Sequence, residues 1–299
     1  MEKIKTGFKF DIDESLKAKM LKEFYATPLA VKYVKKLGIS EDDIDKYIDR
    51  IYDVVSDIKY CENCPGVKAC KKENPILCTK LTYVNGVVNR QLTPCKAVLK
   101  KMEIEEAFTV CDFDKDWLDA SVKDIDQSGP RAQVIHKFKS YSEGKYEGWI
   151  YITGAANSGR TFLTAVLCNK LIAAKNLGPI CFLNTPERIK QLSDFNYNKE
   201  KDKFEKTIEF YSSVPVLVLD DFGNGFISDY IRDAIIQPIL AKRAAKRLLT
   251  VFTSDFTIDE ITTLFTTNQN AGALRAEQIR KIIKALSGNE INLGDLSIY

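Results

Sequence analysis

The chain has 299 residues, of which 45% are hydrophobic and 28% charged, with a formal net charge of +3. This composition is typical of a globular protein of about two domains and excludes a strongly basic or disordered chain. No apolar run approaches the roughly 20 residues that span a bilayer, and the N-terminus lacks a signal-peptide core. We therefore expect a cytoplasmic protein with no membrane partner.

Residues 13–58 carry apolar side chains at spacings of three and four, which predict several helices. Pro28 and the segment 38–40 mark the joints, and Ser40 followed by Asp43 is typical of a helix cap. These apolar stripes predict a small helical core. A partner-binding face is an alternative that the pattern leaves open.

Five of the eight cysteines lie close together in the sequence. In a reducing compartment such clustering favours metal or redox chemistry over disulfides. The Cys61-x-x-Cys64 turn lets two thiolates bind one Zn²⁺ ion tetrahedrally. The predicted zinc ligands are Cys61, Cys64, Cys70 and Cys78. Cys95 is an alternative fourth ligand, and free thiols are an alternative to the whole site.

Two strand-like segments, 80–84 and 87–92, flank Asn85-Gly86, which is the strongest short signal for a hairpin. The segment 109–129 that follows is rich in aspartate and ends in Ser128-Gly129. Its composition predicts a solvated linker rather than a metal site.

These features divide the chain into three parts. We expect a small helical zinc-binding domain over residues 1–108, the linker over 109–129, and a nucleotide-binding domain over 130–299.

The stretch 149–161 organises the second domain. A β-branched and aromatic segment runs into a glycine-bounded loop, and an apolar-periodic helix follows. This layout aims backbone N–H groups and the positive end of a helix at a phosphate chain. The predicted nucleotide-binding residues are Gly154, Ala155, Ala156, Asn157, Ser158, Gly159, Arg160, Thr161 and Phe162. An ordinary glycine turn is the alternative.

Arg160 is the one departure of this loop from the phosphate-binding pattern G-x-x-x-x-G-K-[ST]. Lysine delivers a compact charge to the phosphates, whereas arginine brings a longer planar fork that can also pair with phosphate. We therefore expect nucleotide binding and leave hydrolysis open.

The segment 214–219 is almost wholly apolar, as in a parallel strand buried on both faces. Asp220 and Asp221 end it, at the edge where ligands bind in open α/β sheets. We expect Asp220 to hold Mg²⁺, usually through water, and Asp221 to orient or deprotonate the attacking water. The alternative is a polar turn.

Two further segments complete the predicted site. The strand 248–252 ends in polar residues, of which Ser254 could contact the terminal phosphate or the water. The final helix, 273–287, is basic, and Arg275 or Arg280 could reach the phosphates of a neighbouring subunit. A merely solvated helix face is the alternative.

The order of these parts resembles that of AAA+ ATPases, which are α/β proteins with a P-loop core and a parallel sheet. Segments 219–223, 228–233 and 252–256 resemble bacterial replicative helicase loaders of the DnaI/DnaC type. The cysteine-bearing module in front is similar to the DnaI branch.

The resemblance implies a primosomal protein that binds the hexameric replicative helicase through its N-terminal domain and helps place it on single-stranded DNA. ATP binding would govern self-association and the grip on DNA. The resemblance also implies roles for matched residues: Gly154, Gly159 and Thr161 in the phosphate loop, Asp220 and Asp221 as the acid pair, and Thr253 and Ser254 on the sensor strand.

Three departures from the family pattern concern catalysis. Arg160 replaces the lysine, Asp255 stands where the family usually has asparagine, and Arg275 and Arg280 do not keep the family's R-x-x-x-R spacing. A helicase-binding adaptor that does not hydrolyse ATP is therefore an alternative, as is a transposition-type helper ATPase. A small-molecule kinase is disfavoured, because no arginine-rich lid follows the loop.

Overall fold

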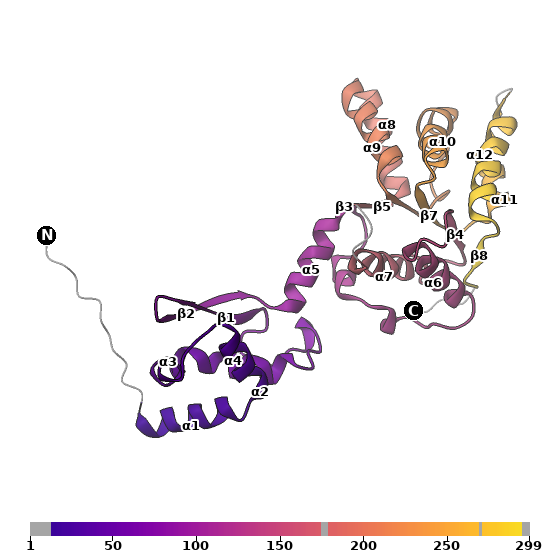
Figure 1. Ribbon diagram of the computed structural model, residues 1–299. Coiled ribbons are helices and arrows are strands. Elements are labelled where there is room, and N and C mark those ends of the chain that lie inside the picture. The colour runs from indigo at the N-terminus through magenta and orange to yellow at the C-terminus, as the bar shows by residue number, and fades with distance from the viewer. Residues whose placement is uncertain (1–12, 175–178, 269–270, 295–299) are drawn as a thin grey trace, which may run out of the picture. The chain divides into compact units, whose positions relative to one another are not determined.

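A computed structural model describes residues 13–174, 179–268 and 271–294 (Figure 1). The chain divides into two compact units, Met1–Met102 and Glu103–Tyr299. The N-terminal residues on which the signal-peptide expectation rests lie outside the described ranges. No helix within the described ranges is long and apolar enough to cross a membrane.

The first unit is helical at its start, as predicted. Its helices are α1 (Glu14–Tyr25), α2 (Pro28–Lys36), α3 (Glu41–Lys46) and α4 (Ile48–Cys61). The predicted cap of α3 is present, because the Ser40 hydroxyl accepts the Asp43 N–H at 3.2 Å. Their apolar stripes meet in one core that includes Phe24, Val34 and Ile51.

The predicted hairpin is also confirmed, with β1 (Leu77–Val84) antiparallel to β2 (Val87–Pro94). Asn85 and Gly86 at its tip both have positive φ, 52° and 74°, the geometry that the Asn-Gly pair favours. A short turn of helix, η1 (Val67–Ala69), lies between α4 and the hairpin in sequence.

The second unit is built on a six-stranded sheet in the order β3-β5-β6-β7-β4-β8, and all its pairings are parallel. Its strands are β3 (Phe108–Cys111), β4 (Ile150–Thr153), β5 (Ile180–Asn184), β6 (Val216–Asp220), β7 (Leu249–Ser254) and β8 (Ile291–Asn292). Thr153 lies opposite Ser254, and Leu219 lies opposite Phe252. The carboxyl ends of β4, β6 and β7 therefore meet at one edge.

Helices cover both faces of this sheet, so the unit has three layers (Figure 1). The helices α6 (Gly129–Ser142) and α7 (Arg160–Ala173) pack on one face. The other face is covered by α8 (Thr185–Tyr197), α9 (Lys201–Ser213), α10 (Gln237–Ala245), α11 (Ile258–Phe265) and α12 (Gly272–Ser287). Neighbouring strand residues enter opposite cores, as Val218 and Leu219 do, because side chains alternate along a strand.

The structure differs from the linker predicted over 109–129. The helix α5 (Lys96–Ala107) leads into β3, which extends the sheet beside β5, and Leu118 in the following turn is buried in the core. Two of the aspartates here have structural roles. The Asp112 carboxylate pairs with the Arg188 guanidinium, and the Asp124 side chain caps a short turn at Ser121. Composition alone could not separate capping acids from solvated ones.

The helix predicted over about 228–246 begins as a π-helix, η4 (Ile231–Ile236), and continues as α10. Pro238 lacks the N–H that would bond to the carbonyl one turn earlier, which favours an irregular turn at this point. The final helix lies within one residue of its predicted bounds.

Candidate functional site

The loop 154–159 joins β4 to α7 with a conformation that requires glycine. Gly154 and Gly159 have φ of 153° and 83°, and Asn157 has φ of 61°. A Cβ at Gly154 would lie 3.0 Å from the Ser158 hydroxyl and 3.1 Å from the Gly294 carbonyl oxygen. A side chain at position 154 would therefore crowd the Ser158 hydroxyl and the Gly294 carbonyl.

This loop has the features of an anion site. It precedes α7, whose first-turn N–H groups have no carbonyl partner within the helix. The Ser158 hydroxyl is buried and has no hydrogen-bond partner in the described structure. Arg131 of α6 donates to the Ser158 carbonyl at 2.9 Å and so fixes the loop from outside. A phosphate chain is the ligand that this donor set fits.

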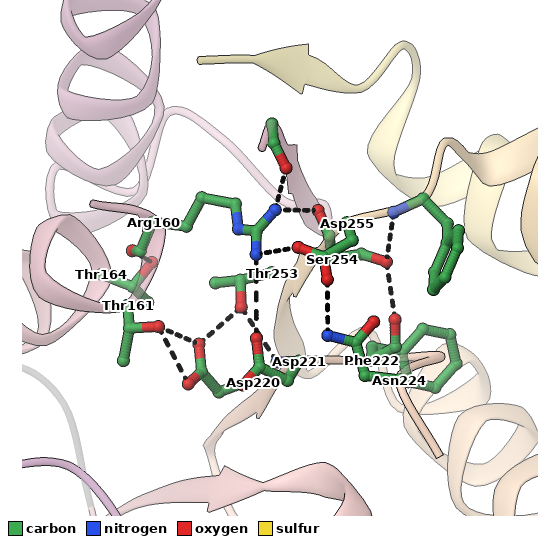
Figure 2. Close-up of polar contacts among 12 residues, drawn as sticks. Arg160, Thr161, Thr164, Asp220, Asp221, Phe222, Asn224, Thr253, Ser254 and Asp255 are labelled. Carbon is green, nitrogen blue, oxygen red and sulfur yellow. Dashed lines mark hydrogen bonds and ion pairs between the residues drawn. The ribbon is translucent and has the colours of Figure 1, made fainter. Parts of the chain in front are cut away.

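Three oxygen-bearing side chains from three elements lie beside the loop (Figure 2). The Thr161 hydroxyl of α7 lies 3.0 Å from both carboxylate oxygens of Asp220 at the end of β6. The Thr253 hydroxyl of β7 also donates to that carboxylate. Magnesium prefers oxygen ligands, so the Thr161 hydroxyl and the Asp220 carboxylate fit it. These two residues would hold the ion, which supplies positive charge to a phosphate chain.

Burial perturbs both acids at the end of β6. Asp220 is only 4% exposed, and burial raises its pKa to about 6, against the opposing hydrogen bond from Thr253. Burial also raises the pKa of Asp221, and the nearby positive charge of Arg160 opposes this shift without cancelling it. Asp221 has a φ of 54°, and its N–H donates to the Thr253 hydroxyl at 3.1 Å. An aspartate in this uncommon conformation is held by its surroundings, as at many functional sites.

Arg160 is turned into the protein rather than left free at the loop (Figure 2). Its side chain is 6% exposed, and its guanidinium donates to the Gly154 carbonyl and, at 2.8 Å, to the Ser254 carbonyl. It also forms an ion pair with Asp255 and lies 3.8 Å from the Asp221 carboxylate. Arg160, at the position whose lysine faces the phosphates in the phosphate-binding pattern, thus donates to acceptors of its own chain.

The polar end of β7 is a network of fixed hydrogen bonds. The Ser254 hydroxyl donates to the Phe222 carbonyl at 2.6 Å and accepts the Phe256 N–H at 3.0 Å. The second carboxylate oxygen of Asp255 accepts a hydrogen bond from the Asn224 amide at 2.8 Å. Ser254 therefore joins β7 to the turn after β6, and its hydroxyl is committed to backbone partners.

Comparison with known proteins finds bacterial helicase loaders among the proteins that this chain is similar to. No model of a known protein family matches the chain. The replicative helicase loader DnaI of Bacillus subtilis strain 168 is 26% identical to it over 249 residues, which cover 77% of this chain and 75% of that relative. A crystal structure of DnaI has a TM-score of 0.53 at 26% identity, over 61% of this chain and 95% of the DnaI chain. The chain is similar to the DnaI-type AAA+ helicase loaders.

A third comparison concerns the fold alone. A Streptococcus pyogenes serotype M3 protein described as a candidate primosome component has a TM-score of 0.50 at 22% identity, over 66% of this chain and 98% of its own. The α/β fold predicted from the sequence, a P-loop core on a parallel sheet, is therefore confirmed for the second unit, and it is the AAA+ fold of the DnaI-type proteins.

The two arginines predicted to act in trans have partners within the chain. Arg275 pairs with Asp233, and Arg280 pairs with Glu277 at 2.7 Å and with Asp259 at 3.0 Å. These pairs lie among η4, α11 and α12 and involve neither acid at the end of β6. An action on a neighbouring subunit, which the basic sequence of the final helix predicted, stays a prediction.

Of the predicted loop residues, Phe162 points to a different role. Its ring packs edge-on against Trp117, with centroids 5.4 Å apart. Sequence reasoning missed three residues near the site: Trp117 packs against Phe162, Arg131 donates to the Ser158 carbonyl of the loop, and Asn224 holds Asp255. No pattern in the sequence marks them, because their roles depend on neighbours far along the chain.

The predicted zinc ligands do not assemble. The sulfurs of Cys61 and Cys78 lie 3.8 Å apart, and the Lys72 ammonium donates to Cys78 at 3.4 Å. Cys64 is exposed, and no three potential metal ligands gather anywhere in the described residues. The described arrangement therefore does not support a tetrahedral site over Cys61, Cys64, Cys70 and Cys78, or one using Cys95, and zinc binding stays a prediction. The CxxC spacing permits convergence of two thiols but cannot determine where distant cysteines lie.

Proposed function

We propose that this chain is a primosomal helicase loader, a cytoplasmic protein that binds the hexameric replicative helicase and places it on single-stranded DNA during replication initiation or restart. The observation that carries the proposal is the similarity to DnaI over 249 residues, joined to the loop-and-acid geometry of the second unit. The first unit, which has a core of its own, is the part we assign to helicase binding.

The second unit, in this proposal, binds ATP with Mg²⁺. The buried Ser158 hydroxyl and the glycine-bounded loop support phosphate binding, and the Thr161–Asp220 contact supports a magnesium site. Asp221, beside Asp220, would accept a proton from the attacking water, a role that its raised pKa supports. Nucleotide binding would control self-association and contact with DNA.

Native mass spectrometry of the full chain mixed with the replicative helicase of its own organism tests this proposal. We expect a defined complex with the helicase hexamer whose stoichiometry or abundance changes when ATP and Mg²⁺ are added. The variant Thr161→Ala should keep the complex but lose its response to ATP. The absence of any complex, with or without nucleotide, would contradict the loader proposal.

A second candidate function is a helicase-binding adaptor that binds ATP without hydrolysing it. The observation in its favour is the ion pair between Arg160 and Asp255, which occupies the cation of the phosphate loop. Phosphate release from the wild type and from Arg160→Lys separates the two candidates. Negligible turnover that the lysine restores supports the adaptor, whereas substantial turnover in the wild type excludes it.

A further inference from the structure

The two unusual charged residues of the site are each other's partners. Arg160 stands where the phosphate-binding pattern has lysine, and Asp255 is an acid at the carboxyl end of β7, 95 positions later. Their side chains form an ion pair in which the arginine is 6% and the aspartate 34% exposed. An unpaired arginine at this depth would be costly, and the ion pair with Asp255 offsets part of that cost.

Asp255 is held at both carboxylate oxygens. One oxygen accepts from Arg160, and the other accepts from the Asn224 amide at 2.8 Å. Arg160 is held as firmly, because the Gly154 and Ser254 carbonyls take further hydrogen bonds from the same guanidinium. The orientation of the loop cation is therefore determined by Asp255 and its neighbours.

This arrangement has a consequence for a phosphate chain in the loop. A terminal phosphate that pairs with Arg160 either shares the guanidinium with the Asp255 carboxylate or displaces it, and in both cases the acid stays near the phosphate. The Asp221 carboxylate, 3.8 Å from the same guanidinium, adds a second like charge. Like charges at such separations disfavour one another most strongly where water is scarce. A chain one phosphate shorter avoids part of this repulsion.

We propose that Asp255 determines the nucleotide preference of this site by holding Arg160 in an internal ion pair, so that the protein binds nucleoside diphosphate at least as tightly as nucleoside triphosphate. The inference rests on the proposed nucleotide-binding function. It makes Asp255 a positioning residue that acts through Arg160, and the neutral amide of Asn224 its support.

Titration of the full-length protein with fluorescently labelled ADP and ATP, at one fixed Mg²⁺ concentration, tests the proposal. The quantity compared is the ratio of the two dissociation constants. In the wild type we expect ADP to bind as tightly as ATP or more tightly. In Asp255→Asn, which keeps the shape but removes the charge, we expect the ratio to shift toward ATP by about tenfold, the equivalent of roughly one acid–phosphate repulsion.

The matched control is Asp194→Asn, which makes the same charge change at an exposed position of α8 outside the site. Its ratio should equal that of the wild type. The double variant Arg160→Lys/Asp255→Asn, which removes the acid and supplies the pattern's lysine, should also prefer ATP, and it serves if the single variant does not fold.

The outcomes separate this proposal from the proposed function. Binding of both nucleotides with one unchanged ratio in the wild type, Asp255→Asn and the double variant overturns the role of Asp255 and leaves the nucleotide site standing. A wild type that prefers ATP tenfold overturns it as well. Failure of every folded variant to bind either nucleotide overturns the nucleotide site and this inference together.

Discussion

The Thr161 hydroxyl at the start of α7 lies 3.0 Å from both carboxylate oxygens of Asp220 at the end of β6, although the two residues are 59 positions apart in the sequence. Parallel packing of β4, β6 and β7 produces this proximity, because their carboxyl ends share one edge of the sheet. A hydroxyl and a buried carboxylate at a phosphate loop form the pair on which magnesium binding would depend.

Removal of the Thr161 hydroxyl should weaken binding of Mg²⁺-nucleotide. In Thr161→Ala we expect the Mg²⁺-dependent part of the affinity to fall about tenfold or more, because one oxygen ligand is lost and a buried acid loses a donor. Isothermal titration with and without Mg²⁺ measures this part directly. Thr161→Ser keeps the hydroxyl and should behave as wild type; equal losses in both variants would show that the methyl group, not the hydroxyl, matters.

Affinity for Mg²⁺-nucleotide should fall as the pH is lowered through about 6. Burial raises the pKa of Asp220 to about 6, so the carboxylate that would hold the ion becomes protonated near that pH. Titrations between about pH 5 and 8, each repeated without Mg²⁺, isolate the magnesium-dependent affinity from titration of the nucleotide itself. A magnesium-dependent affinity that stays constant over this range would contradict the assignment.

The charge of Asp220 should cost stability in the nucleotide-free protein at neutral pH. The pKa of Asp220 is about 6 in the folded state, against an ordinary value of 3.8, so the folded state favours the neutral acid. The stabilisation by the neutral acid is fully present below about pH 4 and is lost as the pH rises through about 6. We expect Asp220→Asn to unfold at higher temperature than wild type at pH 7, by the equivalent of about 1–3 kcal/mol. The difference should shrink near pH 4, and a variant less stable at both pH values would refute this account.

The segment 103–129 should be required for stability of the second unit. A fragment that begins at Glu103 keeps β3, the buried Leu118 and the Asp112–Arg188 ion pair, whereas one that begins at residue 130 loses all three. We expect the longer fragment to unfold cooperatively and the shorter one to be less stable by several kcal/mol, from lost apolar burial and an unpaired arginine. Urea unfolding monitored by circular dichroism compares them, and equal midpoints would restore the linker interpretation.

Local sequence features predicted those elements that local physics determines. The Asn85-Gly86 turn, the Ser40 cap and the apolar segment that becomes β6 are each specified by a few adjacent residues. The order of these elements also predicted the fold of the second unit. The glycine-bounded loop after β4 and the two acids after β6 also lie where the sequence indicated, since each follows directly from a strand, and their binding roles stay predictions.

What the sequence could not predict depends on contacts between distant residues. In the sequence, Asp112 is one of many acids that look solvated. In the folded protein it forms an ion pair with Arg188, which lies 76 positions later. From the sequence, Arg160 is only a replacement for the lysine of the phosphate-binding pattern. The structure shows that it donates a hydrogen bond to Asp255. The cysteine spacing likewise predicted a zinc site that the described arrangement does not assemble, because spacing constrains neighbouring thiols and leaves distant ones free.

Loading of the replicative helicase onto closed circular single-stranded DNA tests the central claim most directly, because a hexameric ring cannot thread onto a circle that has no end. Helicase retained on the circles after gel filtration is measured with and without this protein, in the presence of ATP and Mg²⁺. We predict that retention requires the protein and falls in Thr161→Ala. Equal retention with and without the protein would contradict its role as a loader.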